Sequence, residues 1–110
     1  MLLYFKSAER PALKLWLLDD DGTLIDFSTG YTFVWKIGRL GAAALLTKSS
    51  GITGAVGAGV EPTGTPNVQV TWTAGELNLT AGIYEWQLTC TTAALDRVFG
   101  GRIQILDTIT

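Results

Sequence analysis

Cysteine, histidine and charge are all scarce in this sequence. Its 110 residues include one cysteine and no histidine, and only 16% of them are charged. A lone Cys90 excludes an internal disulfide, so folding does not depend on an oxidising compartment. The absence of histidine removes the commonest general base and the commonest metal ligand. We therefore expect no enzymatic activity, no metal and no cofactor.

Basic residues are also few, and they do not cluster. The net charge is −2, whereas binding to a phosphate backbone depends mainly on grouped Lys and Arg. The eight basic residues are scattered along the chain: Lys6, Arg10, Lys14, Lys36, Arg39, Lys48, Arg97 and Arg102. A nucleic-acid partner is therefore not expected.

Long apolar runs are missing as well, so no segment is predicted to span a membrane. The apolar Met1 to Phe5 is followed at once by charged residues and lacks the pattern of a secretion signal. The simplest expectation is a protein made and folded in a cytoplasm. Hydrophobic residues nevertheless make up 47% of the chain, and four are Trp. With so little surface charge, part of the surface is expected to face another protein.

Apolar residues recur at every second position in most of the chain, which is typical of half-buried β-strands. Turn-rich gaps separate these runs, as in sandwiches and barrels. The sequence thus predicts an all-β fold. The alternating segments are residues 13–18, 31–37, 68–72, 84–91 and 99–105. Residues 24–27 are predicted to form a short return strand.

We expect one domain over residues 1–110, because the length suits one core and no linker divides the chain. Residues 1–8 are predicted to be an extended N-terminal arm or a first strand, and residues 43–48 a strand. The Gly-, Thr- and Pro-rich residues 49–66 are predicted to form a long flexible loop region, with a short strand around residues 52–56.

The segment LTAGIY at residues 79–84 gives the fold its most specific marker. Its Leu-x-x-Gly-x-Tyr spacing resembles the tyrosine corner of immunoglobulin-like domains, where a Tyr near the start of a late strand bonds backbone upstream. In antibody domains a Cys follows two residues later, and here Trp86 stands in that place. An immunoglobulin-like antiparallel β-sandwich is therefore expected. The fold-defining residues are Leu79, Gly82, Tyr84, Trp86 and Trp35.

The segment DDDGTLID at residues 19–26 resembles the first motif of haloacid-dehalogenase-like phosphatases. That resemblance implies Asp19 as nucleophile and Asp21 as acid/base, both helping to hold Mg²⁺. The later acidic residues are dispersed, and no crossover helices of a parallel α/β scaffold are visible. Asp and Gly are also favoured in tight turns. We interpret the motif as a hairpin turn and keep a phosphatase fragment as the least favoured alternative. A weak Ca²⁺ site on Asp19, Asp20 and Asp21 is a further alternative, but no second cluster of ligands supports it.

A carbohydrate-binding β-sandwich module is the second alternative, because aromatic residues can stack on sugars. Trp35 and Trp86 are expected in the core, whereas Trp16 and Trp72 are less certain. Cys90 alternates with Trp86 and is expected to be a small buried residue rather than a nucleophile.

In order and spacing, four segments together resemble the N-terminal domain of phage baseplate upper proteins and related immunoglobulin-like modules of tailed-phage virions. The segments are residues 13–37, 47–56, 68–89 and 97–106. The resemblance implies a structural protein of the tail, baseplate, neck or capsid-associated part of a virion. Its partners would be other virion proteins and copies of itself, and it has no catalytic residues to transfer.

The apolar start of the chain suits sheet-edge pairing or subunit contact. We predict that it contacts a neighbouring subunit or completes the first strand, and that residues 49–66 become ordered on assembly. The candidate contact residues are Leu2, Leu3, Tyr4, Phe5 and Trp72.

Overall fold

The computed structural model describes residues 2–6, 12–39, 41–61, 63–73 and 82–106. Within these ranges it contains eight strands and no helix, so the predicted all-β class is confirmed. The strands are β1 (Leu2–Lys6), β2 (Leu13–Leu15), β3 (Thr32–Gly38), β4 (Ala44–Lys48), β5 (Ile52–Gly54), β6 (Val68–Val70), β7 (Gly82–Thr91) and β8 (Asp96–Leu106).

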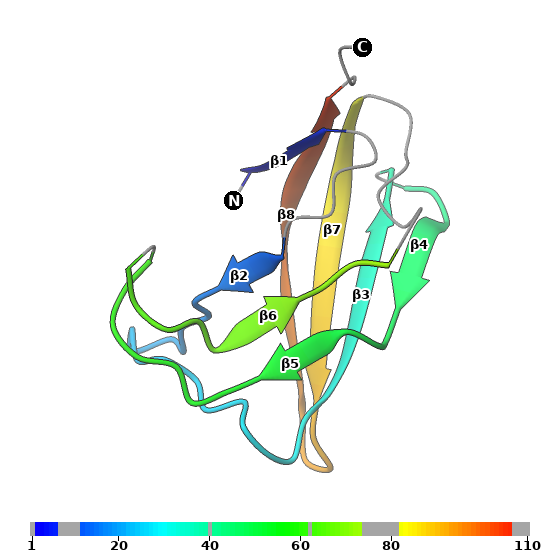
Figure 1. The fold of residues 1–110 in the computed structure, drawn as a ribbon. Coiled ribbons are helices and arrows are strands. Elements are labelled where there is room, and N and C mark those ends of the chain that lie inside the picture. The colour runs from blue at the N-terminus through cyan, green and yellow to red at the C-terminus, as the bar shows by residue number, and fades with distance from the viewer. Residues whose placement is uncertain (1, 7–11, 40, 62, 74–81, 107–110) are drawn as a thin grey trace.

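Five strands form the larger sheet, in the order β1-β8-β7-β3-β4 (Figure 1). The two longest, β7 and β8, have 10 and 11 residues and form a hairpin. The amide of Thr92 closes its turn by donating to the carbonyl of Leu95 at 2.9 Å. β1 lies at the edge and runs parallel to β8, whereas the other neighbours are antiparallel.

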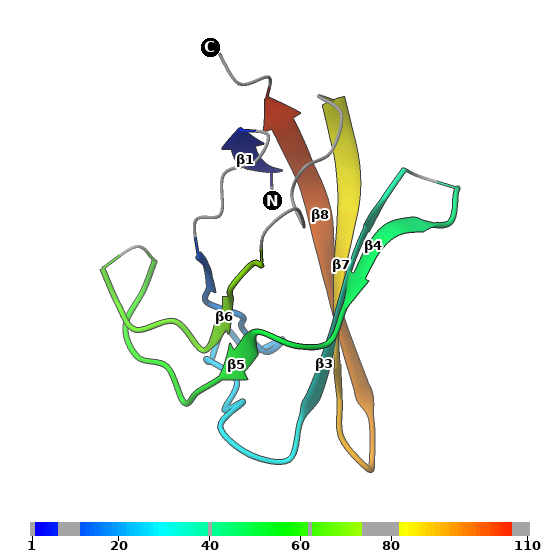
Figure 2. The same cartoon turned by 45° about the vertical axis from the view of Figure 1, so that its right-hand side comes forward.

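Three short antiparallel strands form the smaller sheet, in the order β2-β6-β5. Figure 2 shows this sheet as a separate layer beside β3, β7 and β8. A Cβ at Gly54 would lie 2.1 Å from the carbonyl oxygen of Phe27, so the chain approaches β5 here at a distance that only glycine allows. The two layers confirm a β-sandwich arrangement.

The hydrophobic core fills the space between the two sheets. Trp35 of β3 stacks on Trp86 of β7 with ring centroids 4.9 Å apart, and Trp72 meets Trp35 edge-on at 5.6 Å. These contacts join neighbouring strands of the larger sheet to the segment that follows β6. The buried apolar side chains are Leu13, Leu15, Leu17, Ile25, Phe27, Trp35, Ile37, Val68, Val70, Trp72, Tyr84, Trp86, Leu88, Cys90 and Ile103.

A buried polar residue, Asn67, fixes the irregular segment between β2 and β3. Its Oδ1 accepts from the amide of Leu17 at 2.8 Å, and its Nδ2 donates to the carbonyls of Leu17 and Ile25 at 2.8 and 2.9 Å. Asn67 has no exposed surface. One side chain therefore provides the hydrogen bonds that a regular strand would otherwise provide at this place.

One predicted element differs from that in the structure. Residues 24–27 do not form the predicted return strand, because only a single bridge pairs Leu24 with Leu18 and the amide of Phe27 donates instead to the carbonyl of Ala55 at 3.1 Å. Within residues 49–66, β5 confirms the short strand predicted around residues 52–56, and an isolated antiparallel bridge joins Ala58 to Thr65. β2, β3, β6, β7 and β8 overlap the alternating segments, and β4 lies within the strand predicted at residues 43–48.

Candidate interaction surface

The larger sheet presents one face to the core and the opposite face to solvent. Lys36 on β3, Gln87 on β7 and Val98 on β8 are exposed, and their neighbours along each strand are buried or half-buried. Lys36 lies opposite Gln87, which in turn lies opposite Gly100 on β8. We call this solvent side of β3, β7 and β8 the outer face. None of the other described segments buries these side chains.

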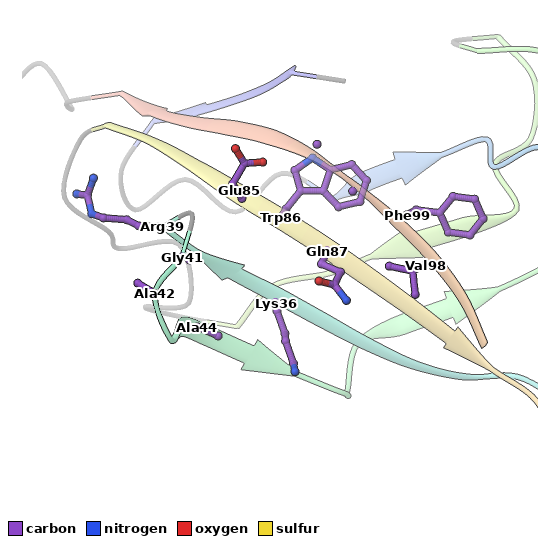
Figure 3. A pocket seen from close by; sticks show the side chains of 13 residues that line it. Lys36, Arg39, Gly41, Ala42, Ala44, Glu85, Trp86, Gln87, Val98 and Phe99 are labelled. Carbon is purple, nitrogen blue, oxygen red and sulfur yellow. The ribbon is translucent and has the colours of Figure 1, made fainter. Parts of the chain in front are cut away.

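A hollow of about 510 Å³ lies on the outer face, between the β3–β4 hairpin and the two long strands. Figure 3 shows Lys36, Gln87 and Val98 projecting toward the same side of the sheet, with Arg39, Ala42 and Ala44 on the hairpin. Its volume lies in the usual range of ligand pockets. The hairpin thus turns an otherwise flat sheet face into a concave one.

Glycines deepen this hollow, because four of its lining positions carry no side chain: Gly38, Gly41, Gly100 and Gly101. A Cβ added at Gly100 on β8 would lie 3.0 Å from the carbonyl oxygen of Trp86. A Cβ added at Gly38 would lie 3.2 Å from the carbonyl oxygen of Ala43. Larger residues at either position would meet backbone rather than a movable side chain. The register that brings Gly100 beside Gln87 therefore determines the shape of the hollow.

Positive charge predominates around the hollow. The Arg39 guanidinium lies over the Tyr84 ring, 4.8 Å from its centroid, which restricts its position. Glu85 is the acidic residue at this site, and Arg102 lies 3.8 Å from its carboxylate. Within the described ranges, no carboxylate forms an ion pair with Lys36 or Arg39. Among the described residues, these two cations are therefore available to an acidic group of a partner.

Exposed apolar residues accompany these charges. Ile83 on β7 and Val98 on β8 are 53% and 58% exposed, and Leu45 on the neighbouring β4 is 57% exposed. Apolar side chains mixed with Arg, Gln and backbone are typical of protein–protein contacts. The surface chemistry of the outer face therefore suits a protein partner.

The Asp-rich segment forms a turn at residues 19–22, at the other end of the sandwich. The amide of Gly22 donates to the carbonyl of Asp19 at 2.9 Å, and the amide of Thr23 donates to Asp21 Oδ1 at 3.0 Å. Hydrogen bonds with the Thr23 side chain and, second, with its backbone lower the pKa of Asp21. Asp19 Oδ1 accepts from the Asp20 amide at 2.8 Å and lies 3.4 Å from Arg97. This geometry is that of a hydrogen-bonded turn.

A metal site does not form around this turn in the structure. No group of three or more Cys, Asp or Glu suited to a metal ion occurs in the part of the chain that the structure describes. Asp19 is instead paired with Arg97. The turn therefore shows neither a cation cage nor a free nucleophile at Asp19.

The lone cysteine is buried at the inner face of β7. Burial raises the pKa of the Cys90 thiol to about 12, although the nearby Arg97 partly opposes that shift. A thiol with such a pKa stays protonated at neutral pH and is a poor nucleophile. The position agrees with the expectation of a small buried residue.

The predicted fold-defining residues fall at the start of β7 and in the core beneath it. Gly82 begins β7 with a φ of 154°, which favours glycine, and Tyr84 is buried two residues later. Trp86 and Trp35 stack on each other, as described above. Leu79 lies outside the described residues, as does the upstream backbone to which a tyrosine corner would bond.

The predicted contact residues lie in two different environments. Leu2, Leu3, Tyr4 and Phe5 belong to β1, so they complete a first strand at the sheet edge, and their contact with a neighbouring subunit stays a prediction. Trp72 is only 8% exposed and packs on Trp35. Its assignment to a contact surface is corrected, because its ring belongs to the core.

Two buried polar residues were not predicted from the sequence. Asn67 is one, and Lys48 is the other: it is buried on β4, donates to the carbonyl of Thr71 and lies 4.8 Å from the centroid of the Trp72 ring. The burial of Lys48 could have been predicted from the alternation along β4, because Lys48 lies two residues after Leu46 and points to the same side of the strand. No comparable signal existed for Asn67, which adjoins inward-facing Val68.

No protein-family model matches this sequence, and no curated protein or solved structure was found to be similar to it. Among the described residues, no helix is long and apolar enough to cross a bilayer.

Proposed function

We propose that the sandwich is immunoglobulin-like, on the basis of its strand order. In immunoglobulin domains one sheet runs G-F-C-C′ and the other contains B, E and D with E between its neighbours. The run β8-β7-β3-β4 and the run β2-β6-β5 can be matched to these two orders. Under this assignment β3 is strand C and β7 is strand F.

The core supports the same assignment. A buried Trp on strand C is a hallmark of immunoglobulin domains, where it packs on the disulfide between strands B and F. Trp35 on β3 is fully buried and stacks on Trp86 of β7. Trp86 follows Tyr84 by two residues, so it occupies the place of the strand-F cysteine. The Trp35–Trp86 stack thus corresponds to the packing of the strand-C Trp on the disulfide, but it lies within one sheet and does not link the two sheets.

The chain is proposed to be a structural protein of a tailed-phage virion that acts through protein–protein contacts. The observation that supports this most is the outer face, where exposed Val98 lines a hollow bordered by Lys36 and Arg39. Neither cation pairs with a carboxylate among the described residues, and Ile83 on the same side of β7 is also exposed. The resemblance of four segments to phage baseplate modules provides the biological setting. The remaining predicted partners, other virion proteins and copies of itself, follow from that setting.

The two alternatives have less support from the geometry. Trp35, Trp72 and Trp86 are buried and Trp16 is half-buried, so no Trp offers a fully exposed ring for stacking on a sugar. Asp19, the nucleophile of the phosphatase alternative, is paired with Arg97 in a hydrogen-bonded turn. Neither alternative is therefore carried further.

The proposal is tested by quantitative mass spectrometry of purified particles carrying wild-type or variant protein. Val98→Glu places an acidic group on the outer face, and we expect it to lower the copy number per particle by about tenfold, a loss of about 1.4 kcal/mol of binding. Val60→Glu is the matched control, because Val60 is 72% exposed in the β5–β6 connection.

Both variants should unfold like wild type, because exposed substitutions have small effects on stability. Absence of the wild-type chain from purified particles would refute a virion role. Equal incorporation of Val98→Glu and wild type would show that the outer face is not the contact.

A further inference from the structure

The described charges of this chain separate into two regions. Around the hollow, Lys36, Arg39 and Arg102 outnumber Glu85. At the opposite end of the strands, near the start of β3 and β8, lies the acidic turn at residues 19–22, drawn between β2 and β3 in Figure 1. The turn contacts Arg97 at the start of β8, whereas Lys36 and Arg39 line the hollow beside the β3–β4 hairpin, and among the described residues no ion pair joins the two regions.

The acidic turn is prepared for binding. Its backbone is closed by bonds from the Asp19 amide to the Thr23 carbonyl at 2.7 Å and from the Gly22 amide to the Asp19 carbonyl at 2.9 Å. Within the described ranges, the exposed Asp20 carboxylate forms no hydrogen bond or ion pair. Leu18, just before the turn, is 51% exposed. A rigid turn thus presents a free carboxylate next to an apolar side chain, with little ordering cost on binding.

The hollow offers the complementary features. Arg39 is restrained over Tyr84, and neither it nor Lys36 has a carboxylate partner among the described residues. Val98 provides an exposed apolar contact at the rim. A volume of about 510 Å³ admits the tip of a turn, and the floor at Gly100 leaves backbone accessible.

We propose that the acidic turn of one copy docks into the hollow of the next copy. Asp20 would face Lys36 and Arg39, and Leu18 would cover the apolar rim. Because the two surfaces differ, the contact is heterologous, and it forms a ring if the rotation closes or a filament if it does not. This inference rests on the proposed structural role and names a partner for it, a second copy of this chain.

The test uses charge reversal on the full chain, measured by sedimentation velocity and light scattering over a concentration series. Lys36→Glu reverses the hollow and Asp20→Lys reverses the turn, leaving the turn bonds of Asp19 and Asp21 intact. Each variant alone is expected to weaken self-association about tenfold or more at low salt. An equimolar mixture of the two is expected to restore it, because both contacts in the mixture are again between opposite charges.

Two exposed residues outside these regions provide matched controls. The control variants are Lys14→Glu and Glu61→Lys. Lys14 lies on β2 of the smaller sheet, and Glu61 lies in the β5–β6 connection. Both should associate like wild type. Raising the salt concentration should weaken wild-type association, since salt screens exposed charges.

This inference would be overturned if the wild-type chain stayed monomeric at all concentrations. It would also be overturned if Lys36→Glu and Asp20→Lys each self-associated as strongly as wild type. Failure of the mixture to restore association would also overturn it. The virion role is tested separately by the presence of the chain in purified particles. A monomer found in particles would refute only the self-docking, whereas a self-associating chain absent from them would refute only the virion role.

Discussion

The two faces of the larger sheet are made by the same strands and have opposite properties. On β7, Trp86 and Leu88 are buried, whereas Gln87 between them is exposed. On β3, Trp35 and Ile37 are buried and Lys36 between them is exposed. The inner face therefore contributes most to stability, and the outer face carries the groups available to a partner.

The largest difference is expected between Trp86 and its neighbour Gln87. Trp86→Ala removes a stacked, buried indole and should lower the free energy of unfolding by about 3–5 kcal/mol. Gln87→Ala should change it by less than about 0.5 kcal/mol. Urea denaturation followed by circular dichroism measures both.

Trp86→Phe is a useful intermediate for that comparison. The buried Trp86 Nε1 makes no hydrogen bond with the described residues, so replacing the indole by a benzene ring loses volume but no polar contact. Its cost should lie well below that of Trp86→Ala. Equal destabilisation by Trp86→Ala and Gln87→Ala would contradict the assignment of the two faces.

A smaller loss is expected at Asn67, which faces the core from the smaller sheet. Asn67→Ala leaves the amide of Leu17 and the carbonyls of Leu17 and Ile25 buried without their partner. Each such loss costs about 1–3 kcal/mol and relaxation recovers part of it, so we expect about 2–4 kcal/mol in total. Thr53→Ala on the neighbouring β5 is the exposed control. A cost below about 0.5 kcal/mol would show that the segment after β2 does not depend on Asn67.

The smallest predicted effect concerns the pH dependence of stability through Cys90. Burial raises the pKa of this thiol from 9.0 to about 12. The thiol therefore ionises first in the unfolded chain, and its contribution to stability is complete below pH 9 and lost as the pH rises toward 12. Between pH 8 and 10, wild type should lose about 1.4 kcal/mol more than Cys90→Ala. Parallel pH profiles of the two proteins would contradict the burial of the thiol.

Much of the fold could be predicted from alternation alone. The segments at residues 31–37 and 84–91 predicted β3 and β7, and the inward phase of Trp35, Trp86 and Cys90 was correct. Alternation reports only which side of a strand a residue faces. It therefore could not give the parallel pairing of β1 with β8, because register and neighbour choice depend on contacts distant in sequence.

The candidate site was the least predictable part. The hollow arises because Gly100 lies opposite Gln87 and the β3–β4 hairpin borders it, and neither relation is local in sequence. Trp72 was predicted to be a contact residue, but Lys48 and Trp35 pack on its ring. Polar residues such as Asn67 enter the core only where several backbone groups need partners, and periodicity gives no sign of that.

Side-chain footprinting of the protein in isolation and in purified particles tests the central claim most directly. The exposed Ile83 and Val98 should be labelled in the isolated chain and protected in the particle, because the outer face is proposed to bind a neighbouring protein. Trp35 should stay unlabelled in both states and serves as the buried reference. Equal labelling of Ile83 and Val98 in the two states would contradict the assignment of the outer face as the contact surface.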